Sequence, residues 1–74
     1  MTNEEKIKFI ESAISKLSRK EVKVKPTDIL ADMNIDSMDI IEMQMWYDDE
    51  FNTVSAEPTG PIITVLDLMN IMAT

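Results

Sequence analysis

The start of a helix is encoded by the segment Ile35-Asp36-Ser37-Met38-Asp39-Ile40-Ile41-Glu42. Asp36 can act as the N-cap, because its carboxylate can accept hydrogen bonds from the amides near Met38 and Asp39. Asp39 stands where a second carboxylate can bond back to the cap residue and complete a capping box. Ser37 is then left with its oxygen pointing outward. The simplest alternative is that Ser37 only contributes to a polar helix start, where serine and aspartate are common.

The composition argues against a catalytic or metal-binding protein. The 74 residues include no cysteine and no histidine, so disulfides, zinc-thiolate sites and the commonest general base are all missing. A chain of this length makes one domain, residues 1–74, with a modestly stable core. We therefore expect no catalytic residue, no metal site and no enzymatic activity. A thiol needed for chemistry would have to come from a cofactor.

Charge is divided unevenly along the chain. All seven basic residues lie in the first 25 positions, where four acids leave a net +3, whereas residues 26–74 hold ten acids and no base. Such a surface repels nucleic acid and attracts basic patches on other proteins, although it can also be merely solubilising. No apolar run has the length of a membrane span, and residues 1–5 are too polar for a signal peptide. The sequence predicts a cytoplasmic monomer with no nucleic-acid binding and no membrane insertion.

Apolar spacing predicts three helices. The first extends from a cap at residues 2–3 to about Ser18, the second from Ser37 to about Phe51, and the last from a cap at Thr64 to the end of the chain. The fold class is therefore all-α: a small antiparallel bundle of three long helices with a short or irregular segment before the last helix.

The two connections are less regular. In residues 20–36, the stretch 21–25 alternates like a strand but has no second strand to pair with, so we expect an extended loop with one short turn near Thr27. Before the last helix, Glu57-Pro58-Thr59-Gly60-Pro61 excludes a regular helix. At most one turn is expected at residues 55–59.

The second helix is apolar on more than one side. The expected core face consists of Ile40, Met43, Tyr47 and Phe51. A second apolar set consists of Met38, Ile41 and Met45. These three side chains either belong to the core or interrupt an acidic outer face that partners can contact. Trp46 either fills the interior or lies on the surface as a contact.

Calcium binding is a further hypothesis to weigh. Asp32, Asn34 and Asp36 match the first three ligand positions of an EF-hand loop. Ser37 replaces the glycine that the turn requires, and Met43 replaces the bidentate glutamate. The sequence therefore does not predict an EF-hand.

The run Leu30-Ala31-Asp32-Met33-Asn34-Ile35-Asp36-Ser37-Met38-Asp39 resembles the attachment site of acyl carrier proteins, in which a leucine and an acid precede Asp-Ser-Leu or Asp-Ser-Met. The similarity continues through residues 48–52 and 63–65, in the family's order. The resemblance implies that Ser37 receives 4'-phosphopantetheine from coenzyme A, with Asp36 and Met38 beside it. It further implies that the protein holds acyl intermediates as thioesters for fatty acid, lipid or polyketide enzymes.

The resemblance also implies a docking face for the phosphopantetheinyl transferase and for acyl-processing enzymes with basic patches. The residues of this face are Asp39, Ile41, Glu42, Met45, Asp48 and Asp49. The prolines of residues 57–61 depart from the family, which usually has a short acidic helix there, so the type of cargo does not carry over. Two alternatives stay open: an aminoacyl, peptidyl or D-alanyl carrier with the same serine, and an acidic helical adaptor without a prosthetic group.

Overall fold

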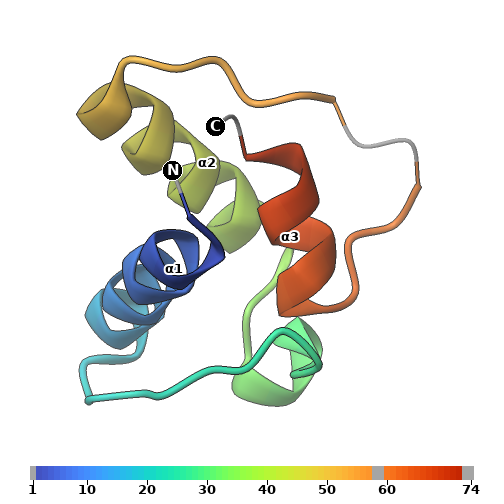
Figure 1. Ribbon diagram of the computed structural model, residues 1–74. Coiled ribbons are helices and arrows are strands. Elements are labelled where there is room, and N and C mark those ends of the chain that lie inside the picture. The colour runs from blue at the N-terminus through green and yellow to red at the C-terminus, as the bar shows by residue number, and fades with distance from the viewer. Residues whose placement is uncertain (1, 58–59, 73–74) are drawn as a thin grey trace.

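Three α-helices and one 3-10 helix form the regular structure of the computed structural model, which describes residues 2–57 and 60–72 (Figure 1). α1 spans Asn3–Ser18, the 3-10 helix η1 spans Leu30–Met33, α2 spans Ser37–Phe51 and α3 spans Val65–Ile71. The described residues contain no strand, so the predicted all-α class is confirmed. α1 and α2 have 16 and 15 residues, but α3 has only seven. The last helix is thus short and ends before the chain does.

Local capping explains where the helices begin. The hydroxyl oxygen of Thr2 accepts a hydrogen bond from the amide of Glu5 at 3.2 Å and starts α1. At α3, the amide of Asp67 donates to the hydroxyl of Thr64 at 3.2 Å, and the amide of Thr64 donates to the Asp67 carboxylate at 3.0 Å. The caps predicted for both helices are confirmed, because each needs residues only three positions apart.

The core lies between α1 and the two helices that it contacts, α2 and α3. Its most deeply buried side chains are Ile10, Ile14, Leu30, Met43, Tyr47, Val65 and Leu68. Burying each of these contributes about 1.5–3 kcal/mol to folding. The expected core face of α2 is right for Met43 and Tyr47 but wrong for Phe51, which is 39% exposed. Phe51 lies at the edge of the core, with its ring centroid 5.0 Å from that of Tyr47.

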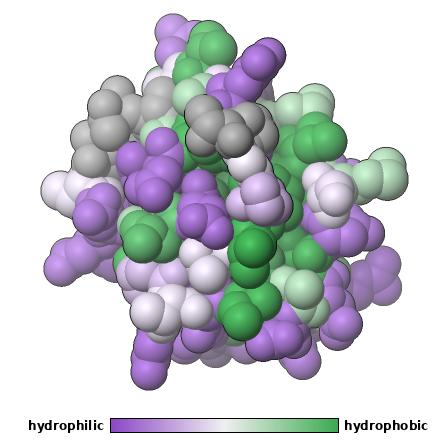
Figure 2. Space-filling view, turned by 90° about the vertical axis from the view of Figure 1, so that its right-hand side faces the viewer, coloured by the Kyte–Doolittle hydropathy of each residue, from purple (hydrophilic) through white to green (hydrophobic). Residues whose placement is uncertain are grey.

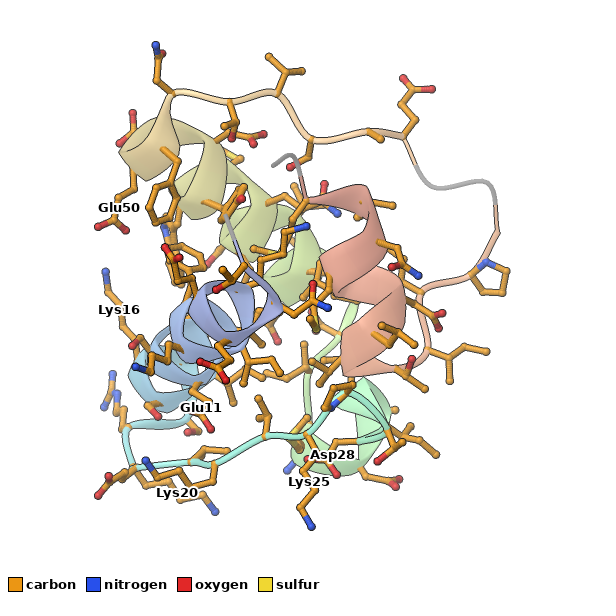
Figure 3. All side chains as sticks on the ribbon, in the orientation of Figure 1. Glu11, Lys16, Lys20, Lys25, Asp28 and Glu50 are labelled. Atoms are coloured by element: carbon orange, nitrogen blue, oxygen red, sulfur yellow. The ribbon has the colours of Figure 1, made fainter. Side chains whose placement is uncertain are left out.

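Residues 21–25, which follow α1, have no neighbouring strand, and side chains of α1 accept the hydrogen bonds of two of their amides. The amide of Val22 donates to the Ser15 hydroxyl oxygen, and the amide of Val24 donates to the Glu11 carboxylate, both at 3.0 Å. Figure 3 shows Glu11 on the side of α1 that faces this segment. The expectation of an extended loop at residues 21–25 is confirmed.

Beyond this loop, the sequence reading missed two features. Leu30–Met33 forms η1 instead of irregular chain. Ile29 makes an isolated antiparallel bridge with Thr64, in which the amide of Leu30 donates to the Ile63 carbonyl at 2.9 Å. This bridge joins the chain just before η1 to the start of α3. It depends on residues far apart in the sequence, so local patterns do not reveal it.

Of the connection from α2 to α3, residues 53–57 pass over the end of the bundle, away from its centre (Figure 1). Asn52 ends α2 in the left-handed region, with φ 53°. Residues 54–57 and 60–63 are not helical, and part of the turn expected at residues 55–59 lies outside the described residues. The amide of Ala56 donates to the Ile71 carbonyl at 2.8 Å. This bond ties the connection to the end of α3.

Candidate functional site

Ser37 is the first residue of α2, and its side chain is exposed. Asp36 is the N-cap: its Oδ1 accepts from the amide of Asp39 at 2.9 Å, and the Asp39 Oδ2 accepts from the amide of Asp36 at 3.2 Å. The predicted capping box is therefore confirmed. The Ser37 hydroxyl takes no part in it and has no hydrogen-bond partner within residues 2–57 and 60–72. The helix start does not depend on this hydroxyl, which leaves it available for chemistry.

The first amides of α2 are only partly used. Asp39 donates to the Asp36 side chain, and Ile40 donates to the Asp36 carbonyl at 3.1 Å. In the described part of the chain, the amides of Ser37 and Met38 have no acceptor. Free amides at the positive end of a helix dipole stabilise an anion. An anionic group on the Ser37 oxygen is therefore chemically compatible with this helix start.

Met38, Ile41 and Met45 do not belong to the core, because they are 72%, 56% and 63% exposed. Their spacing places them along one side of α2. Glu42 and Asp49, which are also exposed, each follow a residue of this apolar row by four positions. Two methionines, an isoleucine and two carboxylates thus form one surface, which we call the α2 face. The core interpretation of its apolar residues is wrong.

Asp48 has a different place from its neighbour Asp49. It is half-buried, and its carboxylate accepts hydrogen bonds from the Thr53 hydroxyl at 2.9 Å, the Ser55 amide at 3.1 Å and the Ser55 hydroxyl at 2.9 Å. Burial raises the pKa of Asp48, but these hydrogen bonds outweigh burial and hold the pKa below its ordinary value. Asp48 therefore fixes the chain after α2, and it presents less free carboxylate to a partner than Asp49 does.

A hollow of about 630 Å³ lies next to the start of α2. It is bounded by the end of α1, by the segment 20–22, by the chain from η1 to Ile35 and by Asp39. Ser37 does not line the hollow itself, but the lining residues Ile35 and Asp39 lie two positions before and after it. Figure 3 shows Lys20, one of its lining residues, on the segment that follows α1. Sequence reading did not find this hollow, because four separate segments form it.

Trp46 lines a second groove, of about 420 Å³, between α1 and α2. The indole is half-buried against the core, and the ammonium of Lys16 lies 4.6 Å from its ring centroid. A cation at this distance over an indole is attracted to the ring. Figure 3 shows Lys16 and Glu50, which both line the groove, on the same side of the molecule. Trp46 thus combines the two roles that the sequence left open, with one side packed and the other accessible.

A third exposed apolar group lies at the bridge between η1 and α3. Ile29, Ile63 and Leu66 are 43%, 52% and 45% exposed. Ile29 and Ile63 are held near each other by the bridge at Thr64. Figure 2 shows apolar side chains among polar ones on the face on the α3 side. This group was not anticipated, because the bridge that assembles it was not.

Within the described ranges, no group of three or more acidic, histidine or cysteine side chains is arranged to hold a metal ion. No helix in those ranges has both the length and the apolar character needed to cross a membrane. Comparisons with protein-family models, with curated proteins and with solved structures found no match.

Proposed function

We propose that this protein is an acyl carrier protein that bears a 4'-phosphopantetheine arm on Ser37 and presents acyl groups to partner enzymes. The observation that carries the proposal is the exposed hydroxyl of Ser37, at the first residue of α2 and outside an intact capping box. The resemblance of residues 30–39 to the carrier attachment site supplies the identity of the group. We also propose that the three α-helices of this chain pack in the antiparallel arrangement of that family.

The residues around Ser37 fit a phosphodiester. Attachment by a separate transferase forms a bond from the Ser37 oxygen to a phosphorus of coenzyme A, while the serine proton passes to a base and adenosine 3',5'-bisphosphate leaves. The unpaired amides of Ser37 and Met38 and the helix dipole then stabilise the negative charge. The arm supplies the thiol that forms thioesters, which the cysteine-free chain itself lacks.

The α2 face supports the partner-binding part of the proposal. Glu42 and Asp49 attract basic patches, and the flexible side chains of Met38 and Met45 adapt to surfaces of different shape. Asp39 and Asp48 contribute mainly by fixing the two ends of α2, because their carboxylates are engaged by the chain itself. The partners are a transferase and acyl-processing enzymes of a fatty acid, lipid or polyketide pathway.

An aminoacyl or peptidyl carrier would use the same Ser37, whereas an adaptor would not. Incubation with coenzyme A, Mg²⁺ and a transferase of broad specificity separates the carriers from the adaptor. Covalent modification of Ser37 supports a carrier, and the cargo is then identified by offering acyl- and aminoacyl-transferring enzymes in turn. A folded protein that is never modified points to the adaptor.

A further inference from the structure

The segment that follows α1 is extended and carries a high local positive charge. Residues 19–25 hold one acid, Glu21, and four bases, Arg19, Lys20, Lys23 and Lys25. The side chains of Lys23 and Glu21 are 80% and 86% exposed, whereas Val24 is buried. Figure 3 shows Lys20 and Lys25 near the two ends of this segment, along the lower edge of the view. The segment therefore presents its charged side chains to the surroundings.

One edge of the segment is bonded to α1. The amides of Val22 and Val24 donate to the side chains of Ser15 and Glu11, both at 3.0 Å. The two donors are two residues apart, which is roughly 6.6 Å in an extended chain. The two acceptors are four residues apart, which is about 6 Å along a helix. Because the spacings agree, the segment lies alongside α1 like a strand and is ordered before any partner binds.

The opposite edge of the segment is unpaired. Successive amides of an extended chain point to opposite sides, so those of Glu21 and Lys23 point away from the acceptors on α1. Within residues 2–57 and 60–72, neither the amides nor the carbonyls of Glu21 and Lys23 have a hydrogen-bond partner. We call these four backbone groups the outer edge. A row of this kind is what an extended peptide pairs with when it adds to an exposed strand.

We propose that the outer edge docks an extended, acidic segment of a partner protein, which adds alongside residues 21–24 as a second strand. Carboxylates of that segment lie opposite Lys23 and near Lys20 and Lys25, and pairs of opposite charge stabilise paired strands. At physiological ionic strength, charges more than about 8 Å away are largely screened, so these local bases outweigh the acids elsewhere in the chain. The docking uses neither Ser37 nor a group attached to it.

A second copy of this chain does not fit the outer edge. Two copies paired in antiparallel fashion about Lys23 would place lysine directly opposite lysine, with Cβ atoms about 4.5–5.5 Å apart. Like charges at that distance oppose pairing, and lysines on an open edge prevent self-association. The same lysines attract an acidic strand. The charge of the segment thus selects the kind of partner that can pair with it.

Hydrogen exchange in the wild-type protein tests the pairing directly. The probe is a capped peptide of about seven residues that alternates glutamate with valine or threonine. At saturating peptide, exchange of the Glu21 and Lys23 amides should slow by about fivefold or more. Exchange of the Val22 and Val24 amides, which are already bonded to α1, should change by less than about twofold. Replacing the glutamates of the peptide with glutamine should weaken binding about tenfold.

Two substitutions at Lys23 separate backbone pairing from charge. Lys23→Pro removes the positive charge and the outward N–H, whereas Lys23→Gln removes only the charge. Both variants should fold, because this side chain is 80% exposed and proline is tolerated where the amide of an edge residue is unbonded. We expect Lys23→Pro to bind the peptide about fivefold more weakly than Lys23→Gln, which corresponds to the loss of one hydrogen bond. If Lys23→Pro does not fold, the exchange measurement decides.

Each outcome supports or overturns the proposal. Slower exchange confined to Glu21 and Lys23, with the larger loss of binding in Lys23→Pro, supports it. Absence of binding at millimolar peptide overturns it. Equal weakening in the two variants, or equal slowing at all four amides, also overturns it, because charge alone then holds the peptide. Binding to phosphatidylserine vesicles that both variants weaken equally, without any response to the peptide, identifies a lipid-binding surface instead.

Discussion

The ammonium group of Lys6 lies 3.1 Å from the carbonyl oxygen of Met72. It also donates to the Met69 carbonyl at 3.3 Å, so one side chain of α1 binds the carboxyl end of α3. Lys6 is only 6% exposed. A cation at the negative end of a helix is favourable, and Lys6 adds a charged donor to these two carbonyl oxygens, of which that of Met69 also accepts from the Met72 amide at 3.3 Å. This contact joins the first turns of α1 to the end of the shortest α-helix.

Replacing Lys6 with methionine tests this contact. The substitution keeps the apolar stem but leaves the carbonyls of α3 without their charged donor, so the free energy of unfolding should fall by about 1–3 kcal/mol. Urea denaturation measures the change. Lys8→Met, at an exposed position two residues further along and on another side of α1, is the control and should change stability by less than about 0.5 kcal/mol. Equal losses in the two variants would contradict a specific role for Lys6.

The hydrogen-bonded carboxylate of Asp48 should make the free energy of unfolding depend on pH. Burial raises the pKa of Asp48, but the hydrogen bonds from the Ser55 amide and from the hydroxyls of Thr53 and Ser55 together lower it by more. The pKa in the folded protein therefore lies below the ordinary value of 3.8. The stabilisation is complete above the unfolded-state pKa and is lost as the pH falls through the folded-state pKa. Asp48→Asn should therefore destabilise the protein near neutral pH and show a shallower loss of stability in acid.

Denaturation at a series of pH values measures this difference. Asp49→Asn removes the same charge from the exposed neighbour and serves as the control. An Asp48→Asn curve that runs parallel to the wild-type curve down to strongly acid pH would be inconsistent with the hydrogen-bonded carboxylate.

Ile41→Glu tests the α2 face. Ile41 is 56% exposed, so the folded protein should tolerate the change within about 0.5 kcal/mol. A partner that packs on this face loses an apolar contact, and we expect kcat/KM of the transferase for this protein to fall about tenfold, equivalent to about 1.4 kcal/mol. Val54→Glu, at an 86% exposed position after α2, is the matched control. If both variants are modified as fast as the wild type, the transferase does not use this face.

The features that could be predicted from the sequence are those set by neighbouring residues. The caps at Thr2, Asp36 and Thr64 each involve residues three positions apart, so the starts of all three α-helices were found. The end of α2 at Phe51 was also correct. The exposure of Ser37 followed from the same local reasoning, because a cap on Asp36 leaves the serine outside it.

What could not be predicted depends on residues far apart in the chain. Lys6 looked like an ordinary member of the basic segment, and nothing near it in the sequence indicates a contact with Met72. The hollow near Ser37 forms only because the ends of α1 and η1 lie close together in the folded protein. Asp48 gave a weak signal in retrospect, because Thr53 and Ser55 offer hydroxyls just after α2 ends. The periodicity of α2 did not show whether Met38, Ile41 and Met45 are buried or exposed. Their exposure depends on how α2 packs against the rest of the chain.

The most direct test of the account is the intact mass of the protein after reaction with coenzyme A, Mg²⁺ and a broad-specificity transferase. Three proteins are compared: the wild type, Ser37→Ala, and Ser12→Ala, which removes another exposed hydroxyl, on α1. Because Asp36 rather than Ser37 caps α2, Ser37→Ala should change stability by less than about 0.5 kcal/mol. The account predicts one added phosphopantetheine on the wild type and on Ser12→Ala, and none on Ser37→Ala. A folded wild-type protein that gains no mass, or equal gains on all three proteins, would contradict it.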